Sequence, residues 1–148
     1  MIEIAIGLGM VLSLIFTETL GVTAGGIIVP GYIALYFTDP IKIVSTFLIS
    51  LLTLYIVKLF SQFMLIYGKR RLVLCLLVGF LLGYLSKIYL VDLDSQYSDI
   101  SVIGNIIPGL IASWMDRQGI LRTISVILIT SSIVAMIMIV IYGGKINV

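Results

Sequence analysis

The sequence predicts an all-α integral membrane protein, on the evidence of its composition and of an apolar Pro-Gly motif that occurs twice. Of the 148 residues, 61% are hydrophobic and 11% are charged, and the mean hydropathy is +1.26. Soluble domains contain roughly 45 to 50% apolar residues, so a chain this apolar is expected in a lipid bilayer. Its length fits a single membrane domain, residues 1–148, without a separate soluble domain.

The repeated motif is an apolar segment with a central Pro-Gly pair, found at residues 25–37 and again at 104–114. Proline removes a backbone hydrogen-bond donor and clashes with the preceding turn, so we expect a helix to break in each segment. The chain is therefore predicted to consist of two repeats, residues 1–69 and 70–148. The positions shared by the two motifs are Gly26, Pro30 and Gly31 in the first and Gly104, Pro108 and Gly109 in the second.

Four longer apolar stretches are predicted to be transmembrane helices, since a hydrocarbon core of about 30 Å needs about 20 residues. The first has no basic residues ahead of it, so we interpret it as a retained helix rather than a signal peptide. Asp39 and Pro40 are typical of a helix start before the second. The stretches are residues 2–16 (running on to 19), 41–67, 72–91 and 120–142. The glycines suited to close helix packing are Gly7, Gly9, Gly79 and Gly83.

Polar residues inside these helices are candidates for function. At 100° per residue, one stripe of the second helix is polar and is expected to face protein or water. Lys58, beside this stripe, is predicted to lie near mid-bilayer, where a lysine costs about 2.5 to 3.5 kcal/mol. It is expected either to pair with a carboxylate such as Glu18 or to offer a fixed charge to an anionic polymer. The stripe and its flank are Thr46, Ser50, Thr53, Ser61, Lys58 and Gln62, and Asn105 is the polar residue of the second motif.

The basic cluster Lys69, Arg70 and Arg71 predicts the orientation of the chain. Positive residues favour the cytoplasmic side, so this cluster is expected inside and the acidic loop 92–99 outside.

Two topologies agree with this orientation. If both Pro-Gly segments are re-entrant, the chain has four full spans and the basic residues divide equally between the two sides. If both cross as short broken helices, there are six crossings in inverted repeats, and the cytoplasmic side is the more basic. Each Pro-Gly segment is shorter than the about 20 residues that a spanning helix needs, and on this ground we prefer the re-entrant pair.

The sequence offers no catalytic or metal-binding constellation. Histidine is absent, the acidic residues are scattered, and Cys75 is the only cysteine, so neither a zinc site nor a nucleophile–base pair can be assembled. A glycine-rich phosphate loop is also missing, so we expect no cofactor on this chain. The net charge of +2 comes from scattered residues and one cluster, so nucleic-acid binding is not expected.

Three segments resemble the PgsC/CapC family of poly-γ-glutamate synthesis proteins: GGIIVPGYIAL, LFSQFMLIYGKRR and IIPGLIASWMDRQG, in this order. The resemblance covers nearly the whole chain and implies the small, non-catalytic membrane subunit of a capsule polyglutamate synthase in the bacterial cytoplasmic membrane. The partners it implies are a PgsB/CapB-like ATP-dependent ligase, which would bind ATP and Mg²⁺, and an anchored, extracytoplasmic PgsA/CapA-like subunit. The chain departs from the family pattern at Thr19, where other members have a basic residue, and in its more acidic central loop.

The resemblance and the residues together leave two functions to compare. In the first, the chain docks the ligase through the basic cluster and helps the anionic polymer to enter or cross the membrane. The alternative is an independent small-solute transporter or channel, because paired broken helices commonly place a binding site near the midplane. A purely structural anchor would leave Lys58 and the paired motifs without a reason.

Overall fold

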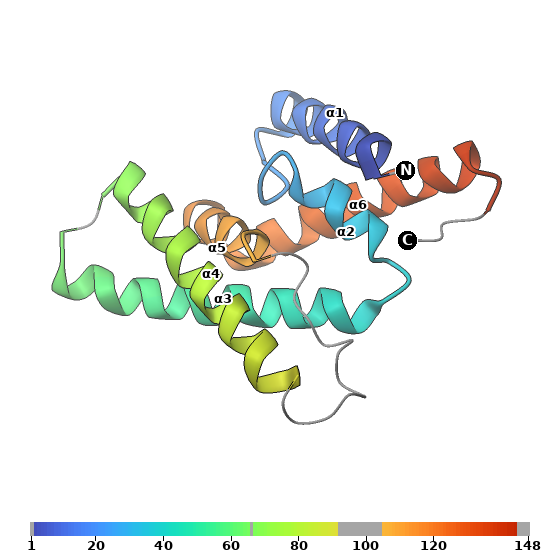
Figure 1. Ribbon diagram of the computed structural model, residues 1–148. Helices are drawn as coiled ribbons and strands as arrows, with labels where there is room; N and C mark the ends of the chain where they lie inside the picture. Colours follow the sequence, from blue (N-terminus) through green and yellow to red (C-terminus); the bar gives the residue numbers. More distant parts are fainter. Residues whose placement is uncertain (1, 66, 92–104, 145–148) are drawn as a thin grey trace.

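The computed structural model describes residues 2–65, 67–91 and 105–144, and within them the chain forms six helices and no strand (Figure 1). The all-α class predicted from the sequence is confirmed. The acidic loop 92–99 and Gly104, both singled out above, lie outside the described residues. The helices are α1 Ile2–Leu20, α2 Val29–Leu35, α3 Pro40–Phe63, α4 Lys69–Val91, α5 Ile107–Gln118 and α6 Ile120–Ile141.

Four of these helices, α1, α3, α4 and α6, are long and apolar enough to cross a membrane. Much of their outer surface is apolar: Val140 is 81% exposed, Tyr55 64% and Leu14 59%. Burying an apolar side chain of this size away from water stabilises a fold by roughly 1.5 to 3 kcal/mol, and side chains exposed to water would lack this stabilisation. In lipid the exposed side chains are already in an apolar solvent. The chain is therefore a membrane protein, as its composition predicts.

Each proline of the repeated motif lies in the first turn of a short helix, Pro30 in α2 and Pro108 in α5. In that position the missing backbone N–H would have no partner within the helix anyway, so proline starts the helix rather than kinking it. The predicted interruption lies just before α2, in residues 21–28, where the backbone is not helical. Gly25 and Gly26 have φ angles of 67° and 121° there, and glycine adopts such angles at little cost.

The glycine after each proline brings two backbones into direct contact. A Cβ atom on Gly31 would lie 2.7 Å from the Cα of Ile6, and one on Gly9 would lie 2.6 Å from the Gly31 nitrogen. Contacts this short leave no room for any side chain. Helices α1 and α2 therefore pack backbone against backbone.

The same contact occurs between α4 and α5. A Cβ atom on Gly109 would lie 2.7 Å from the Cys75 carbonyl oxygen, and one on Gly79 would lie 2.6 Å from the Gly109 Cα. The expected close-packing role is thus seen for Gly9 and Gly79. It is not seen for Gly7, where an added Cβ would meet nothing within 4 Å.

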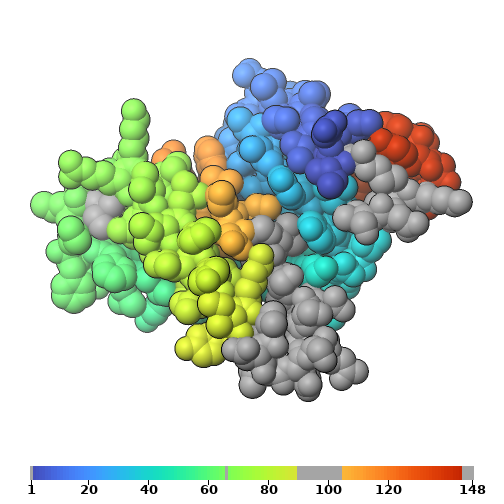
Figure 2. Space-filling view, viewed as in Figure 1, coloured from blue at the N-terminus to red at the C-terminus, as the bar shows by residue number. Residues whose placement is uncertain are grey.

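Each of the two long helices α3 and α6 packs mainly against helices of the other half of the chain. We call α3 and α6 the exchanged helices. Helix α6 packs on α1 and α2 and also on α5 of its own half, whereas α3 packs on α4 and α5. Figure 1 shows α6 running below α1 and behind α2, with α4 crossing α3, and Figure 2 shows α5 in orange between α4 and the blue α1–α2 region. The fully buried Ile33, Ile111 and Ile127, from α2, α5 and α6, belong to one apolar core that joins the two groups.

Each short helix ends beside the start of the long helix that it packs against. Asp116, near the end of α5, contacts Arg71 at the start of α4. The chain must therefore return along the length of α4 before it reaches Asp116. Likewise Leu35, at the end of α2, clusters with Ala5 near the start of α1.

We predict that Gly109→Ala destabilises the protein by about 1 to 3 kcal/mol, because its methyl group would overlap the backbone of α4. Thermal unfolding in detergent measures this as a lower Tm. Gly7→Ala is the matched control in α1, and we expect it to leave the Tm unchanged or to raise it slightly, since alanine favours the helix. Equal Tm values for the two variants would contradict the backbone contact.

Candidate functional site at the basic end

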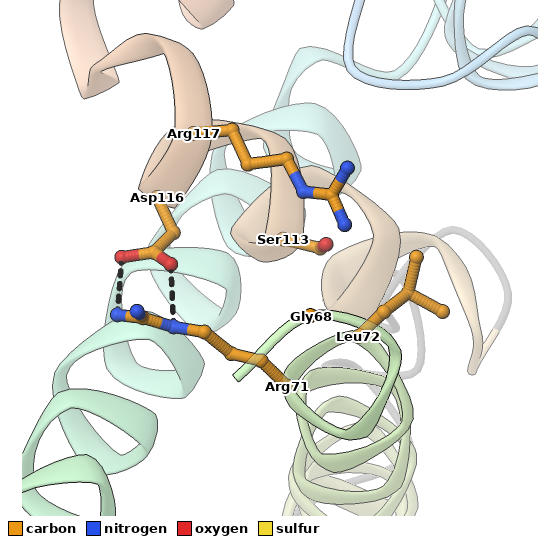
Figure 3. Close-up of a pocket in the computed structure, with 6 residues that line it drawn as sticks. All are labelled: Gly68, Arg71, Leu72, Ser113, Asp116 and Arg117. Carbon is orange, nitrogen blue, oxygen red and sulfur yellow. Dashed lines mark hydrogen bonds and ion pairs between the residues drawn. The ribbon is translucent and has the colours of Figure 1, made fainter. Parts of the chain in front are cut away.

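Charged side chains lie close to the end of α3, the start of α4, the end of α5 and the start of α6. We call this region the basic end, and its members are Lys58, Arg71, Asp116, Arg117 and Arg122. Two cavities open here. The smaller, about 380 Å³, is lined by Gly68, Arg71, Leu72, Ser113, Asp116 and Arg117 (Figure 3). The larger, about 690 Å³, is lined by Lys58, Met115, Asp116, Gln118, Gly119, Ile120, Leu121 and Arg122.

The central interaction of the basic end is a two-point ion pair between Arg71 and Asp116. The Arg71 Nη2 donates to Asp116 Oδ1 at 2.8 Å, and Arg71 Nε lies 2.6 Å from Oδ2. The Asp116 side chain is 12% exposed and the Arg71 side chain 31% exposed. A guanidinium that meets both carboxylate oxygens fixes orientation as well as charge, so this pair sets where α5 ends relative to α4.

The last turn of α5 directs three neighbouring polar side chains to three different places. Helix α5 continues to Gln118 and is broken only by Gly119, whose φ is 97°. Because successive helical residues point about 100° apart, Asp116 faces Arg71 while Arg117 turns back over the Trp114 ring, 5.5 Å from its centroid. In Figure 3 the Arg117 side chain extends away from the ion pair.

Gln118 joins the two halves of the chain through Thr23, which lies in the segment between α1 and α2. The Gln118 Nε2 donates to the carbonyl oxygen and to the Oγ1 of Thr23 at 3.0 and 2.8 Å. The Thr23 backbone N–H donates to Gln118 Oε1 at 3.0 Å. One amide side chain thus satisfies the backbone N–H and C=O of a non-helical residue, which lipid could not do.

Lys58 lies at the basic end, closer to the end of its helix than the sequence predicted. A helix that continued to residue 67 would end about 14 Å beyond Lys58. Helix α3 instead ends at Phe63, five residues after Lys58, so the distance is about 8 Å. The Lys58 side chain is exposed and lines the larger cavity together with Asp116. Within the described ranges, neither ion pair includes Lys58 or Glu18.

The polar stripe of α3 faces protein. Thr46, Ser50 and Thr53 are fully buried, and the Ser50 and Thr53 hydroxyls donate to carbonyls one turn earlier, at 2.7 and 2.8 Å. Hydroxyls that are satisfied by their own helix need no water beside them. The other candidates are dispersed: Glu18 and Gln62 are exposed, and the buried Oδ1 of Asn105 has no partner among the described residues.

The side chains of the basic cluster point in different directions from the first turn of α4. Arg71 turns inward to Asp116, whereas Lys69 and Arg70 are exposed and line a shallow surface beside the first turn of α4. A role for this exposed pair in docking a ligase stays a prediction.

Sequence reasoning missed three residues that organise this end: Thr23, Asp116 and Gln118. The available signal was the run Asp116-Arg117-Gln118 directly before Gly119, at the end of an otherwise apolar helix. No group of three metal-ligating side chains occurs among residues 2–65, 67–91 and 105–144.

The helices and the basic end define a multi-pass membrane protein in which cavities lined by cations lie at one end of a bundle with two exchanged helices. The chain matches the capsule biosynthesis CapC family over residues 8–124, and it belongs to that family.

Two characterised relatives support this assignment. The chain is 39% identical to the PGA biosynthesis protein CapC of Bacillus subtilis (strain 168), over 94% of each chain. It is 40% identical to the capsule biosynthesis protein CapC of Bacillus anthracis, over 86% of this chain and 87% of that protein. No solved structure matches.

We predict that Gln118→Ala lowers the stability of the protein by about 1 to 3 kcal/mol, because it leaves both backbone groups of Thr23 without their partners. The measurement is thermal unfolding in detergent. Gln62→Ala, at an exposed site, is the matched control and should leave the Tm within about a degree of the wild type. An unchanged Tm for Gln118→Ala would argue that water replaces the amide.

Proposed function

We propose that this chain is the small membrane subunit of a poly-γ-glutamate synthase, needed for synthesis of the polymer and for its passage across the membrane. The observation that carries the proposal is the match to the CapC family over most of the chain, with relatives named for capsule and PGA biosynthesis. The cation-lined cavities at the basic end support it, since they suit an anionic product.

The chemistry of amide-bond formation is proposed to reside on a partner. Activating a carboxylate with ATP requires groups that cradle phosphates and bind Mg²⁺, and the sequence has no such loop. A CapB-like ligase that binds ATP and Mg²⁺ would supply this step at the cytoplasmic face, and a CapA-like anchored subunit would act outside. We place the chain in the bacterial cytoplasmic membrane, where both partners can reach it.

We further propose that the chain is an inverted repeat with six crossings. Three pairs of helix contacts support it, because they match between the halves: α1 with α2 and α4 with α5, α2 with α6 and α5 with α3, and α1 with α6 and α4 with α3. The contact of α5 with α6 has no match of similar extent between α2 and α3. With six crossings the basic end, Lys69 and Arg70 lie on one side of the membrane, as the positive-inside rule requires for the cytoplasmic side.

We predict that the chain copurifies from native membranes with the ligase and the anchored subunit, and that the purified chain alone makes no polymer from glutamate and ATP. Pull-down with mass spectrometry and a polymer assay measure the two parts. Polymer synthesis by the isolated chain would overturn the proposal. Solute uptake by the isolated chain in liposomes would favour the transporter function instead.

We predict that Lys58→Met lowers polymer output severalfold while the protein still inserts and copurifies with the ligase, and that Lys58→Arg keeps part of the output. The reason is the loss of one cation from the larger cavity. Lys87→Met, in α4 and away from both cavities of the basic end, is the matched control. Normal output from Lys58→Met would remove Lys58 from the proposed site.

We predict that cysteines placed at Lys69 and Arg117 react with a membrane-impermeant maleimide from the cytoplasmic side only, in a Cys75→Ala background. A cysteine at Asp39 should react only from outside, because α3 carries the chain across between residues 39 and 69. Labelling at Arg117 from outside would instead select four spans with re-entrant segments.

A further inference from the structure

We infer that the basic end binds a polycarboxylate chain, and that Asp116 occupies this site as an internal counter-ion which the carboxylates of an entering chain displace. The inference rests on the proposed function and deepens it, by naming the site at which the polymer would be held. It begins from the charges that line the two cavities of the basic end.

The cavity walls carry an excess of positive charge. Arg71 and Arg117 line the smaller cavity, and Lys58 and Arg122 line the larger one. Against these four cations the walls offer a single acidic residue, Asp116. Cations that line a concave surface between helices attract anions more strongly than cations dispersed on an open surface.

Asp116 is the residue that the two cavities share. Both of its oxygens contact Arg71, in the geometry with which a guanidinium binds any carboxylate. The Asp116 side chain therefore takes the place that a ligand carboxylate would take on Arg71. If it swings away, Arg71 becomes free to bind a carboxylate of the ligand.

The arrangement suits a chain of carboxylates better than a single lipid phosphate. Two cations lie in each cavity, so a ligand must carry several negative charges along its length to meet all four. The planar fork of an arginine binds carboxylate and phosphate alike at two points, so it is the number of charges along the ligand that distinguishes the two. A lone headgroup would fill one cavity and leave Asp116 in place.

The test is equilibrium binding of a fluorescently labelled γ-linked oligoglutamate to the purified full-length chain in detergent, followed by anisotropy. For Asp116→Asn we expect binding about fivefold tighter than for the wild type, because the competing and repelling carboxylate is gone. For Arg117→Gln and Arg122→Gln we expect binding about fivefold weaker each. Added salt should weaken binding in every variant.

Matched controls come from the opposite end of the molecule, where Asp39 pairs with Lys42 at 3.3 Å. Asp39→Asn removes one negative charge from an ion pair, as Asp116→Asn does. Lys42→Gln removes one positive charge, as Arg122→Gln does. Both should bind the probe as the wild type does. A gain in Asp39→Asn equal to that in Asp116→Asn would mean that only net charge matters, and it would overturn the site.

Loss of the ion pair is expected to lower the Tm of Asp116→Asn, and oligoglutamate should raise that Tm by more than it raises the wild-type value, since a ligand stabilises the state that it binds. Should Asp116→Asn fail to fold, the exposed Arg117 and Arg122 variants still decide the question. Wild-type affinity in both would overturn the proposal, as would unchanged or weaker binding by folded Asp116→Asn.

Two further outcomes separate this inference from others. If glycerophosphoglycerol displaces the probe as well as unlabelled oligoglutamate does, the site is for a lipid headgroup and the inference is wrong. If copurification with the ligase and polymer output are normal but Asp116→Asn leaves binding unchanged, the inference fails and the proposed function stands. Loss of copurification would instead count against the proposed function, whatever the binding result.

Discussion

The contact of Gly31 with α1, and of Gly109 with α4, is the constraint on which the rest of the structure depends. Backbone that is not helical must be shielded from lipid by protein. Here residues 24–26 are buried, with Gly25 and Gly26 against side chains of α5 and α6. Helices α2 and α5 themselves lie directly on the backbone of a long helix, with no side chain between them. With the short helices fixed at this distance, their buried isoleucines reach a common core with α6. Any residue larger than glycine in place of Gly31 or Gly109 would push the short helix away from the long one.

The placement of α5 also determines the basic end. Since Gly109 fixes α5 against α4, the final turn of α5 meets the start of α4, and Asp116 reaches Arg71. The same turn sends Gln118 to Thr23 in the other half of the chain. Gln118, which joins the halves, itself lines the larger cavity together with Asp116, so one turn of α5 serves both the packing and the charged site.

Much of this fold could be predicted from the sequence, because hydrophobic length and Pro-Gly pairs are local signals. The four long helices, the interruption before Pro30 and the packing roles of Gly9 and Gly79 follow from such signals. What could not be predicted depends on contacts across the chain. The end of α3 at Phe63, which moves Lys58 towards the basic end, has no marker in an apolar run that continues to Tyr67. The pairing of Asp116 with Arg71, 45 residues apart, also has no local signature.

The exchange of α3 and α6 has a consequence for how the protein is made. A ribosome delivers α1 and α2 to the membrane early, yet their packing partner α6 is the last helix to be synthesised. Until then the first half has an uncovered helix face in the bilayer, where a chaperone, the insertase or a partner subunit can occupy it. Completion of the fold is thus tied to synthesis of nearly the entire chain, and a nascent chain that stops before α6 would expose a surface that membrane quality-control proteases can recognise.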